Sequence, residues 1–266
     1  MLVIDKYVDC AYYSFMASET EKQAVELFHL LFLQQLGTRV DKGLYALKGG
    51  CNLRFFFRSI RYSDDLDLDV HTIAKETLRK NVNQIFKFAG LIRILRAQHL
   101  ELSFLSEPKQ TETTQRWKIH LRTDTGIELP TKIELSRRSF DEGAVFDAVD
   151  PEVAQLHRLR PILTTHYTLE PAFAQKVEAL IHRTETQARD VFDLKFLLDA
   201  GATGSGLSVE TRQKMNTARE NAISVRYDDF IGHVVAYLPP QYQEFYGSRA
   251  TWDRLQETVI QKLEAL

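Results

Sequence analysis

Three aspartates alternate with leucines in one short acidic segment of the chain. The segment reads Ser63-Asp64-Asp65-Leu66-Asp67-Leu68-Asp69. This alternation predicts a β-strand, because successive side chains of a strand leave opposite faces. Asp65 and Asp67 then share one face, about 6.5–7 Å apart along the backbone, and Asp69 continues that face. Asp64 is expected to point to the opposite face and to be dispensable.

Such a row of carboxylates predicts cation chemistry. Two like charges 5 Å apart repel by about 3 kcal/mol at an effective dielectric constant near 20, and Asp is among the poorest strand formers. Hard divalent ions such as Mg²⁺ bind carboxylate oxygens together with substrate phosphates. Two such ions can activate the attacking oxygen and stabilise the leaving oxygen in phosphoryl or nucleotidyl transfer. The alternative is a solvated edge strand whose polar face is all aspartate.

A glycine pair precedes the acidic segment. The run Leu44-Tyr45-Ala46-Leu47 predicts a strand that ends at Lys48-Gly49-Gly50, and residues 51–57 are expected to be helical. Glycines let backbone N–H groups approach an anion, and a helix N-terminus adds favourable partial charge. A phosphate-binding turn ahead of an acidic strand is more specific than either feature alone. The arginines between them could hold phosphates or solvate a helix face: Arg54, Arg58 and Arg61.

Hydrophobic periodicity predicts the elements that position these residues. In the N-terminal half, helices are expected at residues 20–36, 51–57 and 73–97, and strands at 100–106, 115–123 and 127–137. One more strand is expected at residues 162–167. Helices are then expected at residues 171–183, 187–199, 208–222, 228–238 and 250–265, with a glycine-rich loop at 201–206. The predicted class is α+β: a mixed sheet with flanking helices, followed by an α-helical C-terminal half.

Composition restricts the class of protein. The chain has 266 residues and a formal net charge of -2, so a nucleic-acid partner must contact a local basic patch. Its two cysteines, Cys10 and Cys51, form no CxxC pair and predict a reducing compartment. No signal peptide is visible and residues 25–36 are too short to span a bilayer. A cytoplasmic location without membrane contact is therefore expected, and the histidine spacing predicts no zinc site.

Two pairs of motifs resemble those of the AbiEii/AbiGii toxin family. These proteins are nucleotidyltransferases of the DNA polymerase β-like superfamily and occur in bacterial type IV toxin–antitoxin systems. The family pattern KGGTxLR followed by RxSxDxDxD is similar to KGGCNLR at residues 48–54 and RYSDDLDLD at 61–69. The pattern AEKLxALxxR followed by ARDxxDL is similar to AQKVEALIHR at residues 174–183 and ARDVFDL at 188–194. The motifs cover about residues 48–198.

The resemblance implies roles for individual residues. The implied metal ligands, for one or two Mg²⁺ ions, are Asp65, Asp67 and Glu134. The implied nucleotide-binding residues are Lys48, Gly49, Gly50, Ser63 and Arg189. The implied catalytic residues are Asp65, Asp67, Lys176 and Asp190. Cys51 departs from the family, which has Thr or Ser there. A thiol is a poor hydrogen-bond donor, which weakens the expectation of a phosphate contact from this side chain.

The resemblance also implies an activity and a domain division. The activity is magnesium-dependent transfer of a nucleotide from an NTP to an acceptor, with release of pyrophosphate. The tRNA 3′ end is the first acceptor to test, and a cognate antitoxin protein is an expected partner. Residues 1–160 would form the nucleotidyltransferase α/β domain, and residues 161–266 a mainly helical domain that completes the active site. Two alternatives remain: a nucleotide-binding protein without catalysis, and a phosphotransferase on the same fold.

One geometric condition applies to Lys176 and Asp190, which are 14 residues apart. On an unbroken helix they would be separated by about 21 Å, too far for one active site. We therefore predict a break at the polar residues 184–187, with Arg189 and Asp190 in the first turn of the next helix, where an acid is favourable. Without the resemblance, Lys176 would be interpreted as a surface lysine and the following pair as helix capping residues.

A second basic feature lies near the C-terminus. Arg212, Arg219 and Arg226 are spaced by seven residues. On a continuous helix they would form one ridge, able to contact an RNA backbone. Glu210 and Glu220 are interleaved with them and favour an ordinary solvated helix face instead.

Overall fold

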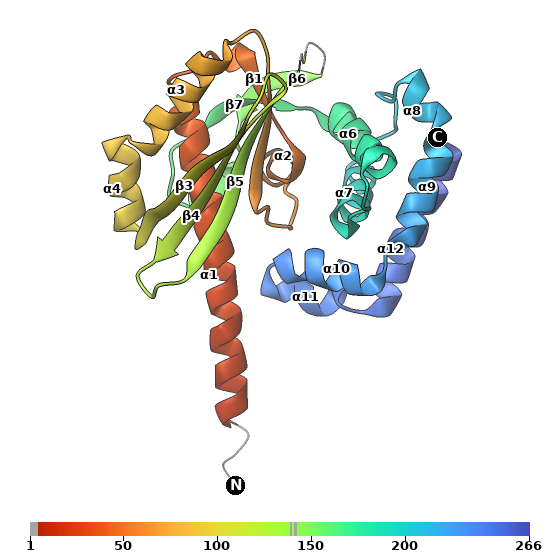
Figure 1. The fold of residues 1–266 in the computed structure, drawn as a ribbon. Coiled ribbons are helices and arrows are strands. Elements are labelled where there is room, and N and C mark those ends of the chain that lie inside the picture. The colour runs from red at the N-terminus through yellow and green to blue at the C-terminus, as the bar shows by residue number, and fades with distance from the viewer. Residues whose placement is uncertain (1–4, 139, 141–142) are drawn as a thin grey trace.

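The computed structural model describes residues 5–138, 140 and 143–266, with side chains from residue 20 onward. Figure 1 shows a twisted sheet with α1 (Asp5–Leu36), α3 (Lys75–Phe86) and α4 (Ala89–Ala97) on one side. On the other side lie α2 (Gly49–Phe57) and, beyond it, the helices of the C-terminal half. The α+β class predicted from the sequence is confirmed, with the sheet in the N-terminal half and helices after it.

Within the described residues, seven strands form one mixed sheet in the order β3-β4-β5-β2-β1-β7-β6. Their bounds are β1 Tyr45–Lys48, β2 Asp65–Val70, β3 Leu100–Gln110, β4 Thr114–Thr123, β5 Glu128–Arg137, β6 Ala144–Ala148 and β7 Leu163–Tyr167. The acidic strand β2 lies at the centre, antiparallel to β1 and parallel to β5. The strand predicted at residues 65–70 is thus confirmed, and its neighbours on both sides come from distant parts of the sequence.

Helix α5 (Pro151–Leu156) lies between β6 and β7, and the later helices follow the sheet and form the C-terminal half. Their bounds are α6 Leu169–His182, α7 Ala188–Asp199, α8 Val209–Gln213, α9 Met215–Ser224, α10 Tyr227–His233, α11 Pro240–Tyr246 and α12 Arg249–Ala265. Two 3₁₀ turns, η1 (Lys42–Leu44) and η2 (Val235–Tyr237), join larger elements. Among the described residues, no helix has the length and apolar character needed to cross a membrane.

Each half of the molecule has an apolar cluster of its own. In the first, α1 packs against the back of the sheet, where Leu66 and Leu68 of β2 and Trp117 of β4 are fully buried. The second gathers side chains of α6, α7, α9, α10 and α12 around Phe230 and Trp252. Burial of the two leucines fixes the orientation of β2, because the intervening aspartates must then face the C-terminal half. The division at residue 160 itself stays a prediction; β7, which follows it, belongs to the sheet.

Several predicted elements differ from those observed. Residues 73–97 form two helices rather than one, with a break at residues 87–88. The buried residues of α3 end at Phe86, and the next buried residue is Leu91. On an unbroken helix Leu91 would point away from that face, since five residues turn it by about 140°. The helix predicted at 208–222 is likewise divided, into α8 and α9.

Three short elements were not predicted at all. They are the strand β6 and the helices α5 and α11. Each is five to seven residues long, too short to show a clear hydrophobic period. The predicted helix at residues 228–238 is also interrupted, since α10 ends at His233 and the 3₁₀ turn η2 follows it.

Candidate active site

Strands β2 and β5 place the three predicted metal ligands on one face of the sheet. The two strands run parallel, with Asp65 beside Lys132 and Asp67 beside Glu134. Neighbouring strands are about 4.8 Å apart, so the carboxylates of Asp67 and Glu134 leave the sheet side by side. The sequence predicted this neighbour relation only through the family resemblance, because strand register cannot be read from one strand alone.

Basic side chains of the same face neutralise two of these carboxylates. The Lys132 ammonium lies 2.9 Å from Asp65 Oδ2. Arg116 donates from Nε to Glu134 Oε2 over 2.6 Å. Two of the three carboxylates are therefore ion-paired, and among the described residues no group of acidic, histidine or cysteine side chains is arranged to hold a metal ion. Metal binding therefore requires Lys132 and Arg116 to release the two carboxylates.

Asp67 differs from its two neighbours, since it forms no ion pair with any described residue. Burial raises the pKa of its carboxyl. The charges of Asp65 and Glu134 raise that pKa further, whereas Lys132 and Lys48 oppose the rise. A buried carboxylate that faces two others is stabilised in its charged form by a bound cation. The donor set, three carboxylates on adjacent strands, therefore fits Mg²⁺, which prefers oxygen ligands.

Asp69, whose role the sequence left open, has protein partners of its own. It forms an ion pair with Lys48 and accepts a hydrogen bond from the Tyr167 hydroxyl over 2.8 Å. Lys48 also donates to Ser136 Oγ over 3.1 Å. These contacts hold the Lys48 ammonium beside the glycine turn, so Asp69 positions a basic side chain rather than completing the carboxylate row.

The glycine turn forms the first residues of α2 and lies against β2. Gly49 has a φ of +69°, in the left-handed region that favours glycine. A Cβ on Gly49 would lie 3.2 Å from Asp67 Oδ2, and one on Gly50 would lie 2.7 Å from Ser63 Oγ. Both glycines are therefore required by close contacts with the acidic segment. The first amides of α2, which carry no side-chain cap, lie next to the carboxylates, as the predicted phosphate site requires.

Cys51 points away from this turn. Its side chain is buried, with Sγ 3.2 Å from the Asp65 carbonyl oxygen and 3.5 Å from His29 Nδ1. His29 Nε2 lies 2.7 Å from Thr131 Oγ1, which donates to the Asp64 carbonyl over 2.6 Å. Burial lowers the pKa of His29 to about 4, so the ring is neutral. This buried chain of polar contacts fixes the backbone at the start of β2, and the sequence contained no local signal for it.

The three arginines between the turn and β2 all have carboxylate partners in the protein. Arg54 donates to Glu26 over 2.6 Å, and Arg58 pairs with Asp150 over 2.6 Å. Arg61 pairs with Asp193, which the sequence analysis did not single out. Neither phosphate binding nor a simply solvated helix face therefore describes these arginines. They form ion pairs that connect the segment to other elements.

The predicted break between Lys176 and Asp190 is confirmed, because α6 ends at His182 and α7 begins at Ala188. The Lys176 ammonium lies 3.0 Å from Asp190 Oδ1 and 2.7 Å from Asp193 Oδ2. Lys176 is 8% exposed and both aspartates are 0% exposed. Lys176 is therefore no ordinary surface lysine, and Asp190 pairs with it instead of capping α7.

Asp193 links this cluster to the acidic segment. Arg61 reaches it from the residues before β2, with Nη2 2.8 Å from Asp193 Oδ2. Although burial opposes ionisation, Arg61 and Lys176 hold the pKa of Asp193 at about 2. Arg183 completes the cluster, with Nε 3.0 Å from Asp190 Oδ2. We call Arg61, Lys176, Arg183, Asp190 and Asp193 the buried ion cluster.

Two cavities adjoin this cluster. The first, which we call the lysine cavity, has a volume of about 580 Å³. Its lining includes Lys48, Gly49, Asp67, Lys176 and Arg183. The glycine turn, one predicted metal ligand and the buried lysine thus face the same space, although they come from β1, α2, β2 and α6.

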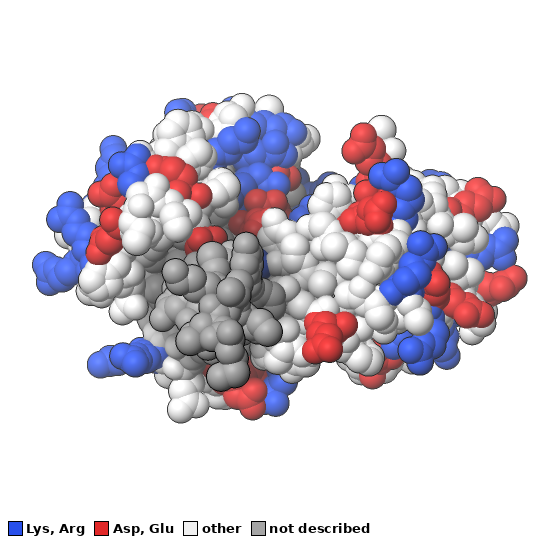
Figure 2. Space-filling view, turned by 90° about the horizontal axis from the view of Figure 1, so that it is seen from below, with Lys and Arg blue, Asp and Glu red and all other residues white. Residues whose placement is uncertain are grey.

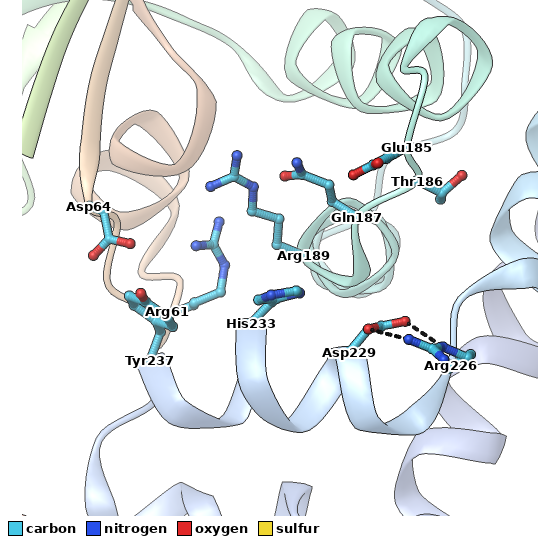
Figure 3. Close-up of a pocket in the computed structure, with 10 residues that line it drawn as sticks. All are labelled: Arg61, Asp64, Glu185, Thr186, Gln187, Arg189, Arg226, Asp229, His233 and Tyr237. Carbon is cyan, nitrogen blue, oxygen red and sulfur yellow. Dashed lines mark hydrogen bonds and ion pairs between the residues drawn. The ribbon is translucent and has the colours of Figure 1, made fainter.

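The second cavity, which we call the arginine cavity, has a volume of about 480 Å³. Figure 3 shows Arg61 and Arg189 directed into the space beside Asp64, with His233 and Tyr237 entering from the turn of α10 and η2. Arg189 therefore lines a different cavity from Lys176 and Arg183. Sequence reasoning missed Tyr237 and His233, because they follow the last recognisable motif.

The expectation that Asp64 points to the opposite face of β2 is wrong. The strand begins at Asp65, so the alternation of faces does not extend to Asp64, which lines the arginine cavity. Burial raises the pKa of its carboxyl, and contact with Tyr237 and the charges of Arg61 and Arg189 oppose that rise. Burial and the Asp64 charge together raise the pKa of Tyr237 to about 12, so its phenol stays protonated and can donate.

The predicted ridge of Arg212, Arg219 and Arg226 does not form. Arg212 lies in α8, Arg219 in α9 and Arg226 immediately before α10. Arg219 pairs with Glu264 and Arg226 with Asp229. The solvated-face interpretation is therefore the better one for these residues.

The chain matches one family of known proteins over residues 31–259, described as "Nucleotidyl transferase AbiEii toxin, Type IV TA system". Among solved structures it is similar to JHP933 from Helicobacter pylori, with a TM-score of 0.54 and 18% identity over 95% of this chain and 94% of that one. It is also similar to MenT4, a nucleotidyltransferase toxin from Mycobacterium tuberculosis H37Rv, with a TM-score of 0.57 and 14% identity over 92% of this chain and 85% of that one. No curated protein matches the chain. At these identities the structural likeness establishes the fold.

Proposed function

The chain belongs to the AbiEii family of nucleotidyltransferase toxins of type IV toxin–antitoxin systems, and from this premise we propose that it transfers a nucleotide from an NTP to an acceptor hydroxyl. One observation carries the proposal. The carboxylates of Asp65, Asp67 and Glu134 share a sheet face beside the glycine turn of α2, and Lys176 lines the lysine cavity together with Asp67. Carboxylates for a metal, amides for phosphates and a held ammonium are what nucleotidyl transfer requires.

In this proposal the triphosphate binds in the lysine cavity. The first amides of α2 donate to phosphate oxygens, as helix N-termini do, and the ammonium groups of Lys48 and Lys176 add positive charge. Asp69 and the buried aspartates hold these two lysines from behind. A positive group held in advance stabilises developing negative charge without reorganisation at the moment of reaction.

Asp65, Asp67 and Glu134 would hold Mg²⁺, as one or two ions. When bound, the metal supplies Lewis-acid activation of the attacking hydroxyl and neutralises the charge on the phosphates. For the metal to bind, Lys132 must leave Asp65 and Arg116 must leave Glu134. Their side chains are 29% and 33% exposed, so both can turn to solvent or to substrate.

The proposed reaction makes one bond and breaks one. The acceptor hydroxyl oxygen bonds to the α-phosphorus of the NTP, and the bond from that phosphorus to the bridging oxygen of the β-phosphate breaks. Pyrophosphate leaves, and the hydroxyl proton passes to a nearby carboxylate or to solvent. In the arginine cavity, Arg189 and the protonated Tyr237 can donate hydrogen bonds to the remainder of the nucleotide.

The acceptor and the biological partner are proposals on the same basis. We take the 3′ end of tRNA as the first acceptor to test, because a nucleotide added there blocks the terminal hydroxyl that carries the amino acid. The family's toxin–antitoxin context suggests a cognate antitoxin protein as a further partner.

The test is transfer of label from an NTP to total tRNA in the presence of Mg²⁺. We expect the α-³²P label to become acid-insoluble with at least one NTP, while the γ-³²P label is released as pyrophosphate. Asp65→Ala should abolish the transfer, whereas Asp253→Asn, an exposed acid of α12, should leave it unchanged. Transfer of the γ label would show a phosphotransferase instead. Calorimetric binding of NTP with no transfer of either label would show a nucleotide-binding protein without catalysis.

A further inference from the structure

Strand β4 carries a row of basic side chains on the face that holds the carboxylates. Along the strand, Trp117, Ile119 and Leu121 are fully buried. Alternation therefore sends the residues between them to the open face. Those residues are all basic: Arg116, Lys118, His120 and Arg122. This pattern lies outside the family motifs at residues 48–69 and 174–194.

The register of the sheet connects this row directly to the carboxylates. Lys118 of β4 lies opposite Lys132 of β5, and Lys132 lies beside Asp65 of β2. With strands about 4.8 Å apart, the Cα atom of Lys118 is about 10 Å from that of Asp65. Ser106 of β3 continues the row outward. Neighbouring residues of β3, β4, β5 and β2 therefore form one line across the sheet. It runs from the edge strand β3 to Asp65, a proposed metal ligand.

Lys118 is the member of this line without an ionic partner. Two like charges directly opposite each other on a sheet are destabilising. Lys132 is compensated by Asp65, but Lys118 is exposed and forms no ion pair with any residue in the described part of the chain. By the argument that applies to the aspartates of β2, a lysine without a counter-charge, opposite a second lysine, indicates a binding site for a group of the opposite charge.

A cleft of about 700 Å³ gives access to this line from solvent. Its lining includes Lys118, His120, Lys132 and Asp65 from the sheet, and Tyr237 of η2. Figure 2 shows basic and acidic side chains meeting in the hollow between the sheet half and the helical half. The cleft is large enough for more than one nucleotide-sized group and reaches the arginine cavity at Asp64, which lines both.

An exposed aromatic pair adjoins the cleft on the same face. The rings of Phe104 and His120 are 4.8 Å apart between centroids, and Phe104 is 45% exposed. His120 is two residues from Lys118, or about 6.5–7 Å along the strand. Exposed rings beside a basic groove bind unpaired bases by stacking, while the basic groups contact the backbone. Farther along β4 the positive charge is neutralised, since Arg122 pairs with Glu101 and Glu128.

We propose that Phe104, Lys118, His120 and Lys132 form the binding surface for the single-stranded end of an RNA acceptor. Lys118 contacts a backbone phosphate, the ring pair stacks on a base, and the terminal hydroxyl is led toward Asp65. The limited length of the charged surface selects a short unpaired end rather than a long duplex. This inference rests on the proposed function, because it assigns the acceptor side of the same site.

The test compares two charge reversals on opposite faces of the sheet. Lys118→Glu changes the proposed surface, and Lys80→Glu changes an exposed lysine of α3 on the other side of the sheet. The measured quantity is the fluorescence anisotropy of fluorescein-labelled total tRNA titrated with each protein. We expect Lys118→Glu to weaken binding about tenfold or more and Lys80→Glu to leave it unchanged. Lys118→Ala should lower the slope of log K against log salt by about one.

Two further measurements separate this inference from general damage to the site. Phe104→Ala should weaken tRNA binding by about 5- to 150-fold, the usual range for loss of one stacked base. NTP binding, measured by calorimetry with Mg²⁺, should be the same in Lys118→Glu as in the unmodified protein. In the transfer assay the KM for tRNA should rise, while kcat at saturating tRNA should change little.

Equal tRNA binding by the two charge-reversal variants would overturn the inference, and so would absence of tRNA binding by the unmodified protein. Failure of the proposed function gives a different result. In that case no α-³²P label is transferred to any acceptor, yet tRNA binding still depends on Lys118, and the surface assignment stands without the reaction.

Discussion

Two sets of ion pairs lie at the centre of this protein, and they differ in burial. On the sheet, Asp65 pairs with Lys132, with side chains 23% and 29% exposed. In the buried ion cluster, Asp193 pairs with Arg61, with side chains 0% and 5% exposed. The separations are similar, 2.9 Å and 2.8 Å. The distance between the charges therefore does not distinguish the two sets, whereas their access to water does.

This difference separates carboxylates that can exchange their cation from those that cannot. A half-exposed lysine can be replaced by a metal ion at little cost, because both charges remain solvated. Removing one partner of a buried pair leaves an uncompensated charge, which costs about 3–5 kcal/mol. Asp190 belongs to a family motif and was expected to be catalytic. That role stays a prediction, and its burial and its contact with Lys176 show that it holds the lysine that faces the cavity.

The largest expected effect concerns the exchangeable set. Asp67→Asn should reduce nucleotide transfer by at least about 10³-fold, the order expected when one group that stabilises the transition state is removed. Its free energy of unfolding should stay the same or rise slightly, because the change relieves repulsion from Asp65 and Glu134. Label transfer and urea unfolding measure the two quantities. A marked loss of stability would place Asp67 in the structural set instead.

Replacing a residue of the buried ion cluster should, in contrast, lower the free energy of unfolding. Asp193→Asn should lower the free energy of unfolding by about 3–5 kcal/mol, because Arg61 and Lys176 lose a buried counter-charge. Asp253→Asn, on the surface of α12, should change it by less than about 0.5 kcal/mol. Urea unfolding of both variants is the measurement. Equal stability of the two variants would contradict the stabilising role of the buried ion cluster.

Acid should weaken the buried set through the same residue. The folded-state pKa of Asp193, about 2, lies below its unfolded value of about 3.9. Its contribution is therefore complete above about pH 4 and is lost as the pH falls toward 2, amounting to about 2–3 kcal/mol. The stability of the unmodified protein should fall more steeply between pH 4 and pH 2 than that of Asp193→Asn. Parallel pH profiles would contradict this assignment.

Arg183 is a partly exposed residue that pairs with a buried aspartate. Its replacement should have the smallest effect on stability. Its side chain is 34% exposed, pairs with Asp190 and lines the lysine cavity. Arg183→Ala should cost only about 1 kcal/mol of stability, because Lys176 still neutralises Asp190. The KM for NTP should rise while kcat stays nearly constant. A loss as large as that of Asp193→Asn would show that exposure does not separate the two sets.

The sequence predicted the parts of the site that depend on neighbouring residues. The strand at Asp65, the glycine turn and the break before Ala188 each follow from local spacing and residue type. Glu134 was placed only through the family resemblance. The pairing of Arg61 with Asp193 joins residues 132 positions apart, and no local pattern indicates it.

Other features of the site depend on where elements begin and how strands align. Asp64 was misplaced because the alternation was extended one residue beyond the start of β2. The basic face of β4 becomes a line toward Asp65 only through the register of three strands. The contacts of His29 with Cys51 and Thr131 likewise require the packing of α1 against the sheet. Such features arise from tertiary structure rather than from periodicity.

Metal binding by the strand carboxylates tests the central claim most directly. Electron paramagnetic resonance of Mn²⁺, titrated in the presence of a non-hydrolysable NTP analogue, measures it without turnover. We predict bound Mn²⁺ in the unmodified protein, loss of that binding in Asp67→Asn, and retention in Asp69→Asn, whose carboxylate holds Lys48 instead. Equal binding of Mn²⁺ by the unmodified protein and Asp67→Asn would contradict the assignment of β2 as the metal-binding strand.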